Sequence, residues 1–157
     1  MSIQITDCKE AVSEHQILEL ERRINSPLPD DYKNFLMQHN GGIPHPDEFC
    51  YSENSQRQYA TVHYFLAVHD GSYDSIYYCI YMFKEREERV PPNLLPIARD
   101  PGGNLICISV SGEDGGKIYF WEHEEEADLA KGEIADYRNV YFIANSFTDF
   151  IAEITKF

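Results

Sequence analysis

The sequence is poor in basic residues and contains no long apolar run. Lys and Arg total 13 against 27 Asp and Glu, which gives a formal net charge of −14 among 157 residues. Phosphates would be repelled from nearly any face of such a molecule, so direct DNA or RNA binding is not expected. No apolar stretch approaches the roughly 18 to 20 residues of a membrane span, and the N-terminus lacks the regions of a signal peptide. We therefore expect a soluble, cytoplasmic protein without membrane contact, folded as one domain over residues 1–157.

Motifs that carry catalysis or hold a cofactor are also missing. The four cysteines, Cys8, Cys50, Cys79 and Cys107, form no Cys-x-x-Cys pair, and we expect free buried thiols, with a disulfide left formally open. There is no His-Glu-x-x-His helix, no calcium loop, no P-loop and no Gly-x-Ser-x-Gly elbow. We expect no catalytic residue, no cofactor and no metal site, although an enzyme whose residues assemble from distant positions stays open.

Two helices separated by a tight break are predicted near the N-terminus. Ser13 and Gln16 match the capping-box pattern, and apolar residues recur at helical spacing over 17–24. The segment 28–31, Leu-Pro-Asp-Asp, is typical of a second helix start, because it places Pro in the first turn and carboxylates at the positive end of the dipole. The segment 40–42, Asn-Gly-Gly, is expected to close that helix.

The middle of the chain predicts a central strand followed by a third helix. Residues 61–68 are aromatic and β-branched, with both alternating sets largely apolar, which favours a strand buried on two faces. Asp74 or Ser75 can cap a helix over 76–89. The last five residues of that helix, 85–89, are charged, and we expect them to be solvated.

The C-terminal half predicts an antiparallel meander and a final helix. Short strands are expected at 94–98, 105–110, 118–121 and 140–144, and Ser146 can cap the last helix. Glycine-rich turns join the first three strands. The sequence therefore predicts an α+β fold, with a mostly antiparallel central sheet flanked by about four helices in a single domain.

Charge is concentrated in one part of the chain. Residues 113–128 hold seven acids and one base, Lys117, which is a net charge of −6 in 16 residues. A solvated loop that keeps the protein soluble is one explanation. The other is a patch for a basic protein partner, with Trp121 and nearby tyrosines as anchors.

Four segments, in order, resemble one family. They are Leu-Pro-x-Asp-Tyr-x-x-Phe-Leu at 28–36 with Asn-Gly-Gly-x-Pro at 40–44, Leu-Pro-Ile-Ala-x-Asp-x-Gly-Gly-Asn at 95–104, Gly-Lys-Ile-Tyr-Phe-Trp-Glu-His-Glu at 116–124, and Ala-x-Ser-Phe-x-x-Phe-Ile at 144–151. Together they resemble the SUKH superfamily, and within it the subfamily of the yeast cell-wall assembly regulator, over a core of about residues 14–157.

This resemblance implies a binding protein and not an enzyme. Bacterial members are largely immunity proteins that neutralise a cognate polymorphic toxin, often a nuclease, whereas fungal members are regulatory scaffolds of cell-wall synthesis with long extensions. The compact acidic chain is similar to the immunity kind, with the scaffold as the alternative. A basic toxin would meet acidic residues, and our predicted partner contacts are Asp47, Glu48, Asp70, Glu113, Asp114, Glu122, Glu124 and Glu125. We expect a monomer or a weak dimer.

Overall fold

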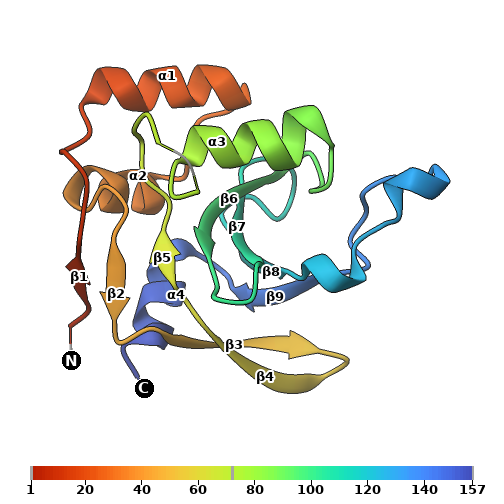
Figure 1. The fold of residues 1–157 in the computed structure, drawn as a ribbon. Helices are drawn as coiled ribbons and strands as arrows, with labels where there is room; N and C mark the ends of the chain where they lie inside the picture. The colour runs from red at the N-terminus through yellow and green to blue at the C-terminus, as the bar shows by residue number, and fades with distance from the viewer. Residues whose placement is uncertain (1, 72, 157) are drawn as a thin grey trace.

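A five-stranded antiparallel sheet forms the centre of the fold. The computed structural model describes residues 2–71 and 73–156. The sheet has the order β5-β6-β7-β8-β9, from Tyr64–Phe65, Leu94–Arg99, Leu105–Ser109, Ile118–Trp121 and Val140–Ala144. Helices cover one face of this sheet, and a long hairpin together with the C-terminal helix covers the other (Figure 1). The predicted α+β class, antiparallel sheet and meander are confirmed.

The two N-terminal helices are α1, Glu14–Ile24, and α2, Asp30–Gln38. The capping box of α1 is present, since the Ser13 side chain accepts from the Gln16 backbone N–H and the Gln16 side chain accepts from the Ser13 N–H. The prediction that residues 40–42 close α2 is wrong by two residues. Gly41 and Gly42 do adopt positive φ, but they turn the chain into strand β2, Ile43–His45, which pairs with β1, Gln4–Thr6.

The third helix is shorter than predicted and changes type. Ser75 caps α3, Ile76–Ile80, which continues as the π-helix η1, Tyr81–Arg86. The chain then turns at Glu88, whose φ is +47°, so that the Arg89 N–H reaches back to the Phe83 carbonyl. The solvated tail predicted for 85–89 is therefore only partly correct: Arg89 is half-buried, with its guanidinium 4.7 Å from the centre of the Phe83 ring.

The single central strand predicted over residues 61–68 is wrong. Its start belongs to the hairpin of β3, Glu48–Glu53, and β4, Gln56–Thr61, and its middle forms the two-residue edge strand β5. The chain changes partners between these elements, because Val62 N–H donates to the Asp47 carbonyl whereas His63 N–H donates to the Arg99 carbonyl. Both alternating sets of side chains in residues 61–68 are apolar because this segment passes from the β3–β4 hairpin to the central sheet.

One continuous core fills both faces of the sheet. On one face the ring of Trp121 meets Phe83 of η1 edge-on, with centroids 5.6 Å apart. On the other face Phe120 packs against Phe49 of β3, which in turn contacts Phe150 of the last helix, α4, Phe147–Ile154. The C-terminal helix is thus docked onto the core, as its apolar face predicted.

The cysteines and the membrane prediction can also be compared with the structure. All four cysteines are free; Cys50, Cys79 and Cys107 are buried as predicted, but Cys8 is exposed. Among the described residues, no helix is long and apolar enough to cross a membrane. Residues 122–138, which we call the arm, contain the short 3-10 helices η2, His123–Glu125, and η3, Leu129–Lys131, and project from the sheet between β8 and β9 (Figure 1).

Candidate functional site

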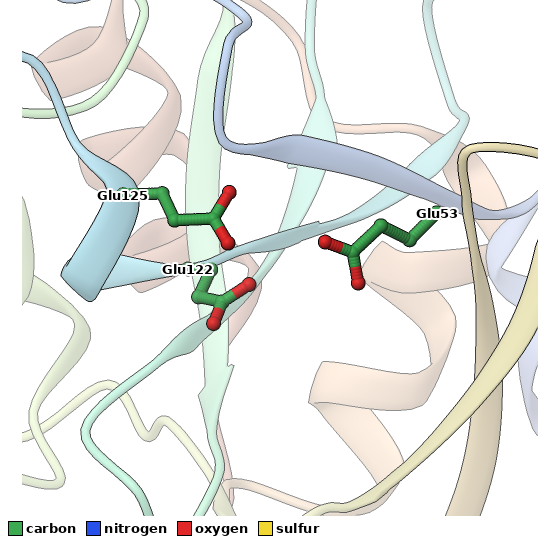
Figure 2. Close-up of side chains that lie close together, drawn as sticks. All are labelled: Glu53, Glu122 and Glu125. Atoms are coloured by element: carbon green, nitrogen blue, oxygen red, sulfur yellow. The ribbon is translucent and has the colours of Figure 1, made fainter.

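Three carboxylates from separate segments converge beside the end of β8. Glu53, Glu122 and Glu125 each place a carboxylate oxygen within 4.8 Å of the others. Figure 2 shows the three side chains pointing toward one another, Glu53 from the hairpin and the other two from the start of the arm. We call these three residues the carboxylate cluster.

Strand alternation brings Glu53 to this place. Phe49, Tyr51 and Glu53 lie on one face of β3, because successive side chains of a strand point to opposite faces. The ring of Tyr51 stacks on Phe120 at 4.5 Å between centroids. The next side chain on that face, Glu53, therefore extends past the apolar layer toward the end of β8.

Backbone hydrogen bonds hold the other two carboxylates. Glu122 follows β8, where its N–H donates to the Asn139 carbonyl and its own carbonyl accepts from the Asn139 side-chain amide. The next residue, His123, donates its N–H to the Asn104 side chain. These bonds start η2, whose single turn carries Glu125 back over Glu122.

Two tyrosines line the carboxylate cluster. The Tyr141 hydroxyl, from β9, donates to Glu125 at 2.5 Å, and the Tyr141 ring lies 5.7 Å from that of Tyr51. Burial and the hydrogen bond to Glu125 raise the pKa of Tyr141, and burial together with the charges of the cluster raises the pKa of Tyr51. The cluster is thus a group of acids beside aromatic rings that carry hydroxyl donors.

The described residues supply no ion-pair partner to this site. In the part of the chain that the structure describes, none of the ion pairs involves Glu53, Glu122, Glu124 or Glu125. Partial burial raises the pKa of the Glu122 carboxyl, and the neighbouring charges raise it further. A cationic group from outside would relieve this repulsion.

The ligand chemistry of the cluster suits two kinds of cation. Carboxylate oxygens are the ligands that hard divalent cations prefer. The same oxygens are acceptors for the guanidinium of an arginine or the ammonium of a lysine. Exposed acidic groups often gather without holding a metal ion, so the cluster alone gives no reason to prefer a metal over a protein cation.

Asp114, one of the predicted contacts, occupies a different environment in the β7–β8 turn. Its carboxylate accepts hydrogen bonds from the Ser109 hydroxyl at 2.9 Å and from the Tyr119 hydroxyl at 3.0 Å. The Asn93 amide lies 3.5 Å from both of its oxygens. The donors of the protein itself already satisfy this acid.

The other predicted contacts do not form one patch. Asp47, Asp70, Glu113 and Glu124 are exposed, and only Glu124 lies beside the carboxylate cluster, within η2. Glu48 is the first residue of strand β3, where it is paired with Thr61. The structure thus groups Glu122, Glu124 and Glu125 and separates them from the rest.

Sequence reasoning missed two members of the site, Glu53 and Tyr141. The signal for Glu53 is the alternation of residues 49, 51 and 53 followed by Asn54 and Ser55, which both adopt positive φ in the hairpin turn. Tyr141 lies in a correctly predicted strand, but nothing in that strand's pattern indicates its partner 16 residues earlier.

Comparisons with known proteins agree with the sequence resemblance. The model of the SMI1 / KNR4 family (SUKH-1) matches residues 11–153, a range that contains all four segments described above. A protein of Bacillus subtilis (strain 168), the SPbeta prophage-derived uncharacterized protein YokK, is 32% identical over 153 residues, which covers 87% of this chain and 71% of the relative.

Proposed function

Because this chain belongs to the SMI1 / KNR4 family (SUKH-1), we propose that it is an immunity protein, which binds a cognate toxin and blocks its activity. Family membership supports the proposal, because the bacterial members of this family are largely immunity proteins. So does the relative of prophage origin, since it places a similar chain on a mobile genetic element.

The observation that carries the proposal is the carboxylate cluster. Glu53, Glu122 and Glu125 face one another, and no ion pair between described residues involves them. Tyr51 and Tyr141 border them. A toxin that acts on nucleic acid binds phosphates through Lys and Arg, and those side chains would be attracted to these carboxylates. The tyrosine rings offer rigid contact area of the kind that dominates protein interfaces.

The proposed mode of action is occupation of the toxin surface, without catalysis and without a cofactor. A net charge of −14 raises the rate of encounter with a basic partner and opposes binding to a second copy of the same chain. We therefore infer a monomer or at most a weak dimer, acting in the cytoplasm, where an immunity protein would meet a delivered nuclease. The attraction weakens as salt screens it, over a Debye length of about 8 Å at physiological ionic strength.

Protection in cells tests the proposal. The proposal predicts a toxin domain encoded near this chain's gene, and that domain is expressed from an inducible promoter, alone and together with the chain. We expect growth to be restored only by co-expression, and the purified chain to form a complex with that domain that weakens between 50 and about 500 mM salt. Absence of protection and of a complex would overturn the proposal.

The regulatory scaffold makes a different prediction in the same strain. Affinity capture with this chain as bait would then recover signalling or wall-synthesis proteins, and co-expression would leave the toxin active. That combined result would replace the immunity proposal with the scaffold.

A further inference from the structure

A groove lies on the helical side of the arm, away from the carboxylate cluster. Its volume is about 640 Å³, and it is lined by the end of α1, by η1 with the turn that follows it, and by residues 129–135 of the arm. Ile24, Ile80 and Val90 supply its apolar lining from the body of the protein, and Ile80 and Val90 are buried. The arm supplies Leu129 and Ile134.

Ile134 is the most exposed large apolar residue described in this chain. Its relative exposure is 79%, and Leu129 on the same wall is 36% exposed. Burial of an aliphatic side chain is favourable, and the isolated chain leaves most of the Ile134 side chain exposed to water. Exposed apolar side chains gathered at a groove and surrounded by charge are typical of a protein-binding site.

The charged residues of the groove are mostly acidic. Four of its lining residues are glutamates, Glu85, Glu87, Glu88 and Glu133, and two are cations, Arg23 and Lys84.

Both cations of the groove are already engaged. Arg23 makes two hydrogen bonds of 2.7 Å to Glu85. The Lys84 ammonium donates to the carbonyls of three residues in the segment 91–94, at 2.6 to 3.3 Å.

Three of the four glutamates are paired in turn, Glu85 with Arg23, Glu87 with Arg89 and Glu133 with Arg138. Among residues 2–71 and 73–156, Glu88 has no ion-pair partner, so it is the carboxylate that the groove leaves without a neutralising charge.

We infer that this groove receives an apolar side chain of a partner protein, from a segment that carries Lys or Arg next to that side chain. The apolar side chain would contact Ile24 and Ile134, and the neighbouring cation would face Glu88. This contact goes beyond the proposed function, because it is separate from the carboxylate cluster. It rests on that function only if the partner is the toxin.

The negative charge of the chain favours a basic protein segment in the groove over a second copy of the chain or a nucleic acid. A second copy of the chain, at a net charge of −14, would bring further acids to an acidic groove. Nucleic acid is opposed for the same reason. A basic segment with one apolar side chain would cover the exposed aliphatic surface and pair with the Glu88 carboxylate.

Peptide titration followed by NMR tests the inference without any toxin. The full chain, labelled at isoleucine methyl groups, is titrated with the peptide Lys-Lys-Leu-Lys-Lys, with Lys-Lys-Ala-Lys-Lys and with Glu-Glu-Leu-Glu-Glu. We expect the methyl resonances of Ile134 and Ile24 to shift with the first peptide, with at least threefold smaller shifts for the second and none for the third. Equal shifts with the first two peptides, or shifts confined to isoleucines away from the groove, would overturn the inference.

Two variants, each with a matched control variant, sharpen this test. Ile134→Asp should weaken binding of the leucine peptide at least tenfold, whereas Leu18→Asp, at another exposed apolar position (49% exposed), should leave it unchanged. Glu88→Lys should weaken binding about fivefold, and Glu10→Lys, an exposed acid near the N-terminus, should change it less than about twofold. Equal losses in the variant and its control would show a non-specific effect and contradict the groove. Growth protection by the wild-type chain is scored separately, so this result and the proposed function can fail independently.

Discussion

The two ends of strand β8 carry acids of the same sequence run in opposite environments. Before the strand, Asp114 accepts hydrogen bonds from Ser109 and Tyr119 and lies beside the Asn93 amide. After the strand, Glu122 faces other carboxylates and takes part in none of the ion pairs among the described residues. The acids before and after β8 look alike in the sequence, because both belong to the same acidic run. The donors that each fold position supplies decide which acid stabilises the fold and which is available to a partner.

The first prediction concerns Asp114, where the largest loss of stability is expected. Asp114→Ala removes the acceptor of the Tyr119 hydroxyl and one of the two acceptors of the buried Ser109 hydroxyl, which also lies 3.0 Å from the Ser111 carbonyl. We expect the free energy of unfolding to fall by about 1 to 2 kcal/mol, measured by urea denaturation. Partner binding by the folded variant should be unchanged. A loss below about 0.5 kcal/mol would show that Asp114 is not a structural acid.

The second prediction compares two tyrosines that donate to carboxylates at opposite ends of β8. Tyr119→Phe removes a bond to Asp114 and should cost about 1 kcal/mol, whereas Tyr141→Phe, which removes a bond to an exposed Glu125, should cost less than about 0.5 kcal/mol. Burial and the bond to Asp114 raise the pKa of Tyr119 to about 12. Ultraviolet titration of Asp114→Ala should show that this pKa falls. Equal losses from the two tyrosines would remove the contrast between the two ends.

The third prediction is small and depends on pH. The pKa of Glu122 is raised in the folded state, so the folded protein binds this proton more tightly than the unfolded chain. The contribution of Glu122 to stability is therefore highest below about pH 4 and falls as the pH rises through the raised pKa. Glu122→Gln should gain about 0.5 kcal/mol at pH 7 and nothing at pH 4.

Glu113→Gln is the matched control for that measurement. Glu113 is an exposed acid at the other end of β8, and its replacement should change the stability at neither pH. A gain at pH 7 that is equal in the two variants would reflect the net charge of the chain and not the repulsion within the carboxylate cluster.

Local signals in the sequence predict most of the elements. The capping residues Ser13, Ser75 and Ser146 all begin helices, because each side chain accepts from a backbone N–H of the first turn. The strands of the antiparallel meander are predicted by their apolar residues and by the turn residues between them. The segment 61–68 fails because a chain that passes from one layer to another is apolar on both alternating sets, which is also the pattern of a central strand.

The carboxylate cluster was only partly predictable. Glu122, Glu124 and Glu125 are adjacent in a strongly acidic run, which local charge indicates directly. Glu53 joins them through a long-range packing contact, the stacking of Tyr51 on Phe120, that no local pattern encodes. Asp114 was placed in the same patch because sequence charge does not reveal hydrogen-bond donors brought by folding.

The association rate of the cognate toxin domain tests the central claim most directly, because that claim is electrostatic. Glu53, Glu122 and Glu125 are changed together to Gln, and the control changes Glu10, Glu14 and Glu19 of the exposed N-terminal region to Gln, so both variants lose the same charge. At low salt, we expect association to slow about tenfold in the cluster variant and less than about threefold in the control, with the difference disappearing at high salt. Equal slowing in both variants would contradict the account, because binding would then depend on net charge and not on the carboxylate cluster.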